Sequence, residues 1–210
     1  MRYRSILIAA VVSITPAIAS AQSLFIPRGD HGVEGSASWS VGPSSTGVET
    51  HAGVSLDGRI DLGIGFNRYN VDLGDTDSPF TEWTPFVTYF VFKEQDDKTP
   101  VSLAVHGQAF FDNFEGDDSG WYVLAGSSLF KRLEMTSKFA LYPYLGFSLA
   151  HESYTFGGGP AETATYLTRQ LGVHALATLG KGAWLRFSLD EHSFRRETYR
   201  AARAAFVKRF

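Results

Sequence analysis

Residues 33–41 read VEGSASWSV, with apolar or small side chains at the odd positions and Glu34 or serine at the even ones. The same period of two continues in VETHAGVSL at 48–56 and in IDLGIGFN at 60–67. Successive side chains of a β-strand point to opposite faces, so this alternation predicts strands with one apolar and one polar face. The segment between the last two, LDGR at 56–59, is typical of a tight hairpin turn.

The alternation extends over most of the remaining chain. It recurs at 101–109, 141–149, 171–179 and 184–190. Three less regular stretches, 83–92, 121–130 and 199–210, are interpreted as strands from their length and aromatic content. The sequence therefore predicts an all-β fold of ten strands, or of eight if an ambiguous pair is really loop.

The connections between these strands differ in length. Those after the second, sixth and eighth strands are compact, whereas 71–81, 112–120, 155–163 and 194–198 are longer. Short turns at one end and longer loops at the other are typical of an antiparallel transmembrane up-and-down β-barrel. An even number of strands puts both termini at the short-turn end, which is the periplasmic end in such barrels.

Composition narrows the class of protein. The 210 residues carry a net charge of −3 and no cysteine, which excludes a disulfide scaffold, a thiolate metal site and a thiol nucleophile. The near-neutral charge argues against nucleic acid as a partner. The 30 aromatic residues against 2 methionines favour strands over helices.

The first 21 residues are predicted to be removed. Arg2 and Arg4 precede the short apolar run ILIAAVVSI at 6–14, and Ala19-Ser20-Ala21 follows. This is the charged, apolar and small-residue order of a secretory signal peptide. We expect one β-barrel domain over 22–210, exported from the cytoplasm.

The polar faces of the predicted strands carry ionisable and amide side chains. A soluble core of ten strands could not bury them cheaply, whereas a narrow barrel lumen can pair them with one another. The apolar faces would then meet lipid, and a soluble periplasmic β-protein is the alternative fold. The predicted lumen network consists of Glu49, His51, Asp61, His106, Gln108, Arg186, Asp190 and Arg203. Aromatic residues near strand ends are candidates for interfacial girdles: Trp39, Trp83, Tyr89, Trp121, Tyr142, Tyr144 and Tyr199.

The chain ends on Phe210, with Phe206 in the same register. With the leader, the alternation and the loop asymmetry, the chain resembles the outer-membrane β-barrel proteins of Gram-negative bacteria. That resemblance implies an outer-membrane location, contact with lipid and lipopolysaccharide, and recognition of Phe206 and Phe210 by the barrel-assembly machinery. Lys208 departs from the pattern, which prefers an apolar residue there.

One short motif suggests chemistry. His151 and Ser153 share the predicted lipid-facing side of their strand, and Glu162 lies across the following loop. The pair is similar to the His-x-Ser of the outer-membrane lipid A 3-O-deacylases, which implies Ser153 as nucleophile, His151 as base and Glu162 as the group that orients it. Tyr154 departs from that family, which has Asn there, and the motif lies three strands before the end rather than near it. No spacing of histidines predicts a metal site, and no cofactor is expected.

Charge gathers in the predicted long loops. Two of these loops are acidic, with Asp72, Asp75, Asp77 and Glu82 in one and Asp112, Glu115, Asp117 and Asp118 in the other. Arginines gather near the last loop, where they could pair with lipopolysaccharide phosphates: Arg195, Arg196 and Arg200.

The leading functional prediction is non-enzymatic. It is a small outer-membrane barrel that is structural or provides a narrow passage for small polar solutes. An outer-membrane lipid A acyl-ester hydrolase and a surface interaction protein using the acidic loops are the alternatives, and the sequence identifies no partner protein.

Overall fold

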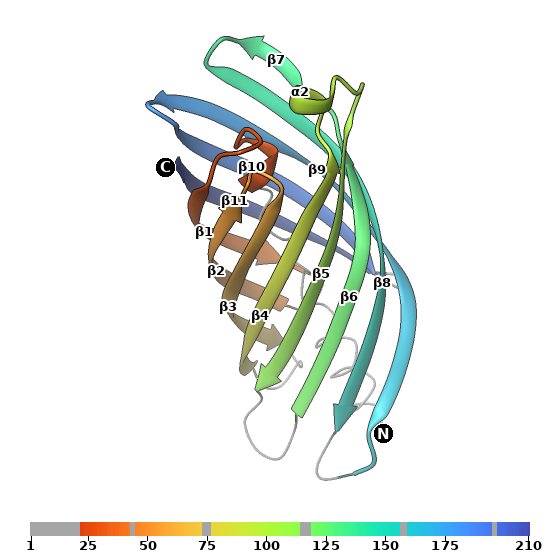
Figure 1. The fold of residues 1–210 in the computed structure, drawn as a ribbon. Helices are drawn as coiled ribbons and strands as arrows, with labels where there is room; N and C mark the ends of the chain where they lie inside the picture. The colour runs from red at the N-terminus through yellow and green to blue at the C-terminus, as the bar shows by residue number, and fades with distance from the viewer. Residues whose placement is uncertain (1–21, 43–44, 73–76, 114–118, 156–158, 195–196) are drawn as a thin grey trace.

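A computed structural model describes residues 22–42, 45–72, 77–113, 119–155, 159–194 and 197–210. The predicted leader, 1–21, lies outside these residues. The described part is almost entirely β-strand, with one short 3-10 helix, η1, and one helical turn, α2 (Figure 1). The elements are η1 (Gln22–Leu24), β1 (Gly32–Val41), β2 (Ser45–Leu56), β3 (Ile60–Asp72), β4 (Asp77–Phe92), α2 (Glu94–Asp97), β5 (Ser102–Asn113), β6 (Ser119–Phe130), β7 (Leu133–Thr136), β8 (Phe139–Thr155), β9 (Glu162–Gly180), β10 (Ala183–Phe194) and β11 (Glu197–Arg209).

Ten of the strands close into a barrel, which confirms the predicted fold and strand number. Each strand pairs antiparallel with its neighbour, β1 pairs with β11, and β6 pairs with β8. Closure leaves these strands no unpaired edge. The four-residue β7 pairs with β8 beyond the end of β6 and extends the wall outside the ring, in a segment predicted to be a compact turn.

The two ends of the barrel differ. The end that we call the turn end carries α2, the β7–β8 hairpin and Phe210, whose N–H donates to the carbonyl of His31 at 3.0 Å. The opposite end, the loop end, carries the connections at 42–45, 72–77, 113–119, 155–162 and 194–197. At the turn end Asp57 and Gly58 both have positive φ, 56° and 57°. This is the conformation that a two-residue hairpin turn requires.

The strands are longer than predicted, and four predicted loop acids are strand residues: Asp72, Asp77, Glu82 and Asp112. β4 begins at Asp77 rather than near 83, and β5 extends to Asn113. Glu82 and Asp112 are therefore buried inside the barrel instead of lying in external loops. They face each other across β4 and β5. Asp75, Glu115, Asp117 and Asp118 lie outside the described residues.

The barrel carries its apolar side chains outward. Valine, leucine, isoleucine and phenylalanine are exposed all around the wall, as are Trp39, Trp83 and Trp121. Buried glutamates, aspartates, histidines and arginines fill much of the interior. This inverted polarity is that of a barrel that crosses a membrane. Among the predicted girdle residues, Tyr89 is also exposed, but Tyr142, Tyr144 and Tyr199 are buried and point inward, so the prediction is wrong for these three.

No helix in the described part of the chain is long and apolar enough to cross a membrane.

Candidate functional site

The middle of the lumen holds a network of charged and polar side chains. Arg186 Nη2 on β10 donates to Glu34 Oε1 on β1 at 2.7 Å. Glu49 on β2 accepts hydrogen bonds from Ser38 Oγ and Tyr69 Oη, both at 2.8 Å, and from Arg203 Nη2 at 3.3 Å. Carboxylates in a low-dielectric interior need such partners, and here the partners come from strands on both sides of β2.

The structure places all eight predicted lumen residues inside the barrel, and it brings only some of them together. Glu49 contacts His51 Nε2 at 3.4 Å as well as Arg203. The other predicted members bind residues outside the predicted network or are buried without joining it. Asp190 accepts from Tyr144 Oη, His106 Nε2 lies 3.0 Å from Ser148 Oγ, Asp61 binds Ser23, Arg186 binds Glu34, and Gln108 is buried on β5.

The segment before β1 enters the turn end of the barrel. Ser23 N–H donates to both carboxylate oxygens of Asp61, at 2.9 and 3.0 Å. Lys93 Nζ donates to the carbonyls of Ser23 and Ile26, at 3.1 and 2.7 Å. Leu24 and Phe25 are buried against inward-facing aromatic residues, and the ring of Phe25 lies edge-on to Tyr142 with centroids 5.1 Å apart. We call residues 23–26 the N-terminal plug.

The lumen is filled along its length. The largest fully buried side chains include Phe90 near the turn end, Arg186 and Tyr69 further along, and Tyr154 near the loop end. A passage wide enough for water would leave inward-facing side chains exposed. An eight-stranded barrel is just wide enough inside for side chains to fill it, and the lumen widens gradually with strand number, so ten strands leave a narrow one.

The predicted hydrolytic residues do not come together. His151 and Ser153 lie on the outer face of β8, and His151 Nδ1 is 2.8 Å from Thr165 Oγ1 on β9. The His151 ring also contacts Trp121, with centroids 5.7 Å apart. Glu162 pairs in register with Tyr154, whose side chain points into the lumen, so it lies on the opposite face of the sheet from Ser153.

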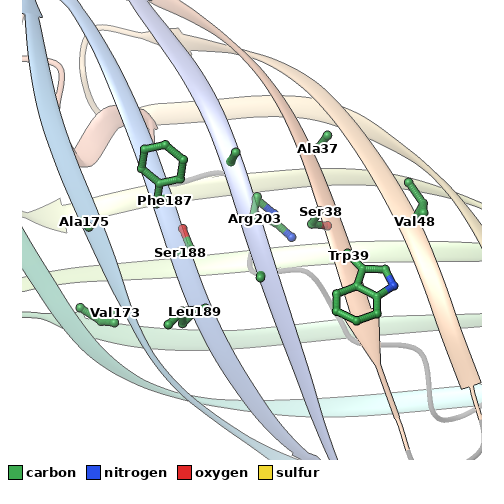
Figure 2. Close-up of a pocket in the computed structure, with 12 residues that line it drawn as sticks. Ala37, Ser38, Trp39, Val48, Val173, Ala175, Phe187, Ser188, Leu189 and Arg203 are labelled. Atoms are coloured by element: carbon green, nitrogen blue, oxygen red, sulfur yellow. The ribbon is translucent and has the colours of Figure 1, made fainter.

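A groove crosses the outer wall over β9, β10, β11, β1 and β2 (Figure 2). Its volume is about 640 Å³, within the roughly 300–1,000 Å³ of small-molecule sites. The register explains its shape, because Phe187, Ala204 and Ala37 form one row across β10, β11 and β1, and Leu189, Ala202 and Trp39 form the next. Alanine methyl groups form the floor, and the larger side chains stand on both sides. We call this feature the wall groove.

The ends of the wall groove along β11 are chemically different. Toward the turn end the next outward residue is Phe206, which is 46% exposed. Toward the loop end it is Arg200, whose side chain is 79% exposed and whose Nε lies 3.3 Å from Glu191 Oε2. Arg169 on β9 is also exposed near this end, and its Nη2 lies 3.4 Å from Ser193 Oγ.

Sequence reasoning found the lumen face but missed the plug and the wall groove. The alternation at 199–210 contained a signal for the groove, because the outward positions 202 and 204 are alanine where most other strands carry large apolar residues. Phe206 and Phe210 are both exposed, at the turn end of β11. Arg195 and Arg196 lie outside the described residues. Within the described residues, no group of three or more His, Asp or Glu side chains is placed to hold a metal ion.

Comparison with known proteins identifies the fold and no family. No family model and no curated protein sequence matches the chain. An outer-membrane channel from Pseudomonas putida F1 matches with a TM-score of 0.51 and 12% identity, over 94% of this chain and 100% of that one. Neisserial surface protein A matches with a TM-score of 0.48 and 10% identity, over 86% of this chain and 97% of that one. At 12% identity the likeness to the channel establishes the β-barrel fold and nothing about activity.

Proposed function

We propose that the chain is a small outer-membrane β-barrel protein with a structural, non-enzymatic role, sealed along its axis and embedded in lipid through its wall. The observation that carries this proposal is the filled lumen. Arg186 and Glu34 are each about 1% exposed inside the barrel, beside the N-terminal plug that occupies its turn end. A narrow passage for small polar solutes has no such support.

The location rests on the inverted polarity of the wall. An apolar outer face around the whole ring is stable in a hydrocarbon layer and aggregation-prone in water. The predicted leader supports export, and the turn end is then periplasmic, with the loop end outside the cell. Phe206 and Phe210 at the turn end of β11 are the residues we propose for recognition by the barrel-assembly machinery.

Single-channel conductance in a planar bilayer tests the proposal. The refolded barrel is expected to insert and to give no discrete current steps, whereas a 16-stranded porin measured alongside gives an open channel. Heat-dependent migration on a gel would verify that the silent protein is folded. Reproducible current steps above the detergent blank would overturn the sealed-barrel proposal and would make a narrow passage for small polar solutes the leading proposal.

A further inference from the structure

The wall groove has features that an ordinary lipid-facing surface lacks. Other strands carry large outward side chains in succession, such as Leu62, Ile64 and Phe66 on β3, and where small outward residues recur, as at Ala125 and Ser127 on β6, no arginine follows them on the strand. On β11 the outward positions are Arg200, Ala202, Ala204 and Phe206 in order. At about 3.4 Å per residue, Arg200 and Phe206 are about 20 Å apart along the strand. The result is a slot with an apolar floor and apolar walls, with Phe206 beyond one end and the cationic Arg200 beyond the other.

The slot matches an amphiphile. A flexible acyl chain fits between Trp39 and Phe187 over the two alanine methyl groups (Figure 2). An anionic group at the head of that chain would meet Arg200, and Arg169 lies one row further toward the loop end on β9. Guanidinium groups bind phosphate oxygens through paired N–H donors. The pair with Glu191 uses Nε, and the high exposure of Arg200 leaves most of its guanidinium accessible.

The position of Trp39 indicates how deep the slot lies in the membrane. Tryptophan is enriched at the level of the lipid headgroups. Trp39 lies in the row of Ala202, one row below Arg200. The arginine end of the slot is thus at headgroup level when the alanine floor lies in the hydrocarbon.

The geometry points to the wall groove as a specific binding site for one acyl chain of a phosphate-bearing lipid, with its anionic headgroup on Arg200 and Arg169. This inference rests on the proposed membrane location and deepens it by naming a lipid class. A second copy of the barrel is the less suitable occupant. A two-fold dimer would place one concave slot against another and bring two sets of arginines together.

Quenching of Trp39 fluorescence by brominated acyl chains tests the site. The barrel is reconstituted in phosphatidylcholine vesicles containing either brominated phosphatidylglycerol or brominated phosphatidylcholine. The signal of Trp39 is obtained as the difference from a Trp39→Phe variant. We expect brominated phosphatidylglycerol to occupy the site next to Trp39 in preference to brominated phosphatidylcholine, by about fivefold for each arginine that contacts the headgroup.

Two pairs of variants make the test specific. Ala204→Phe fills the slot and should abolish the preference, whereas Ala125→Phe, at an exposed outward position on β6, should preserve it. Arg169→Gln with Arg200→Gln should reduce the preference to about one, whereas Arg132→Gln at the turn end should not change it.

Three other outcomes of these experiments would contradict the lipid site or the proposed function. A missing preference at Trp39, or one that the filled and neutralised variants keep, overturns the lipid site. A barrel that sediments as a dimer in detergent and becomes monomeric with Ala204→Phe would assign the groove to a second copy and overturn the lipid site too. Loss of quenching at every tryptophan, the exposed Trp83 and Trp121 included, would mean that the barrel is not embedded and that the proposed function itself fails.

Discussion

Arg186 and Glu34 form a buried ion pair at 2.7 Å inside the barrel, 152 residues apart in the chain. One lies on β10 and the other on β1, with β11 between them, so the pair spans the junction of the first and last strands of the ring. Its formation depends on closure of the barrel.

Removing one partner of this pair should destabilise the barrel strongly. Glu34→Gln leaves the Arg186 guanidinium buried with a neutral partner, and we expect the free energy of unfolding to fall by about 3–5 kcal/mol. Urea unfolding in phospholipid vesicles, followed by tryptophan fluorescence, measures the loss. Glu191→Gln is the matched control, because its pair with Arg200 is exposed and should contribute about 1 kcal/mol or less. Equal losses in the two variants would contradict the central role of the inner pair.

Lys93 should hold the N-terminal plug in place. Lys93→Met removes the donor to the carbonyls of Ser23 and Ile26, and an unsatisfied buried polar group costs about 1–3 kcal/mol. We expect faster hydrogen exchange and protease cleavage at residues 23–27, with the strands still protected. Lys98→Met, on the same connection, is the control. An unchanged exchange rate at the plug would show that its apolar contacts and the Ser23–Asp61 hydrogen bonds hold it without Lys93.

The period of two was sufficient to predict which face each strand residue occupies, but it was insufficient to predict partners. Glu49, His51 and Arg203 meet as their shared face suggests, whereas Arg186 pairs with Glu34, which the sequence did not single out. Partner choice inside a barrel depends on the stagger between strands and on the distance across the lumen, and neither is encoded in the alternation of one strand.

The strand ends and the plug were also not predictable from the local sequence. Asp77 and Pro79 are typical of loops, so the sequence predicted a loop over residues that belong to β4. The prediction failed because pairing with the neighbouring strands of the barrel overrides the local preference of these residues. Leu24, Phe25 and Ile26 are three consecutive apolar residues outside any alternating stretch. That run was the available signal, but the residues that bind the plug, Asp61 and Lys93, lie 38 residues from Ser23 and 67 to 70 residues from Ile26 and Ser23.

Gly47 should tolerate no side chain. A Cβ at this position would overlap the ring of Tyr69, which covers the glycine from β3 and donates to Glu49. Gly47→Ala must displace that ring, and we expect a loss of about 1–3 kcal/mol from overpacking. Gly35→Ala on β1 is the control, because a Cβ there meets nothing within 4 Å. Unfolding of both variants in vesicles gives the comparison, and a neutral Gly47→Ala would mean that Tyr69 moves without cost.

Ser153→Ala should leave lipid A unchanged. A serine nucleophile needs a base within hydrogen-bond reach and a third group to orient the base. Here His151 Nδ1 is 2.8 Å from Thr165 Oγ1, and Glu162 lies on the opposite face of the sheet. Mass spectrometry of lipid A from Gram-negative cells that produce the wild type, Ser153→Ala or no protein should give the same acyl pattern in all three. Loss of one acyl chain with the wild type and its return with Ser153→Ala would establish the hydrolase instead, and would require an acid other than Glu162 to orient His151.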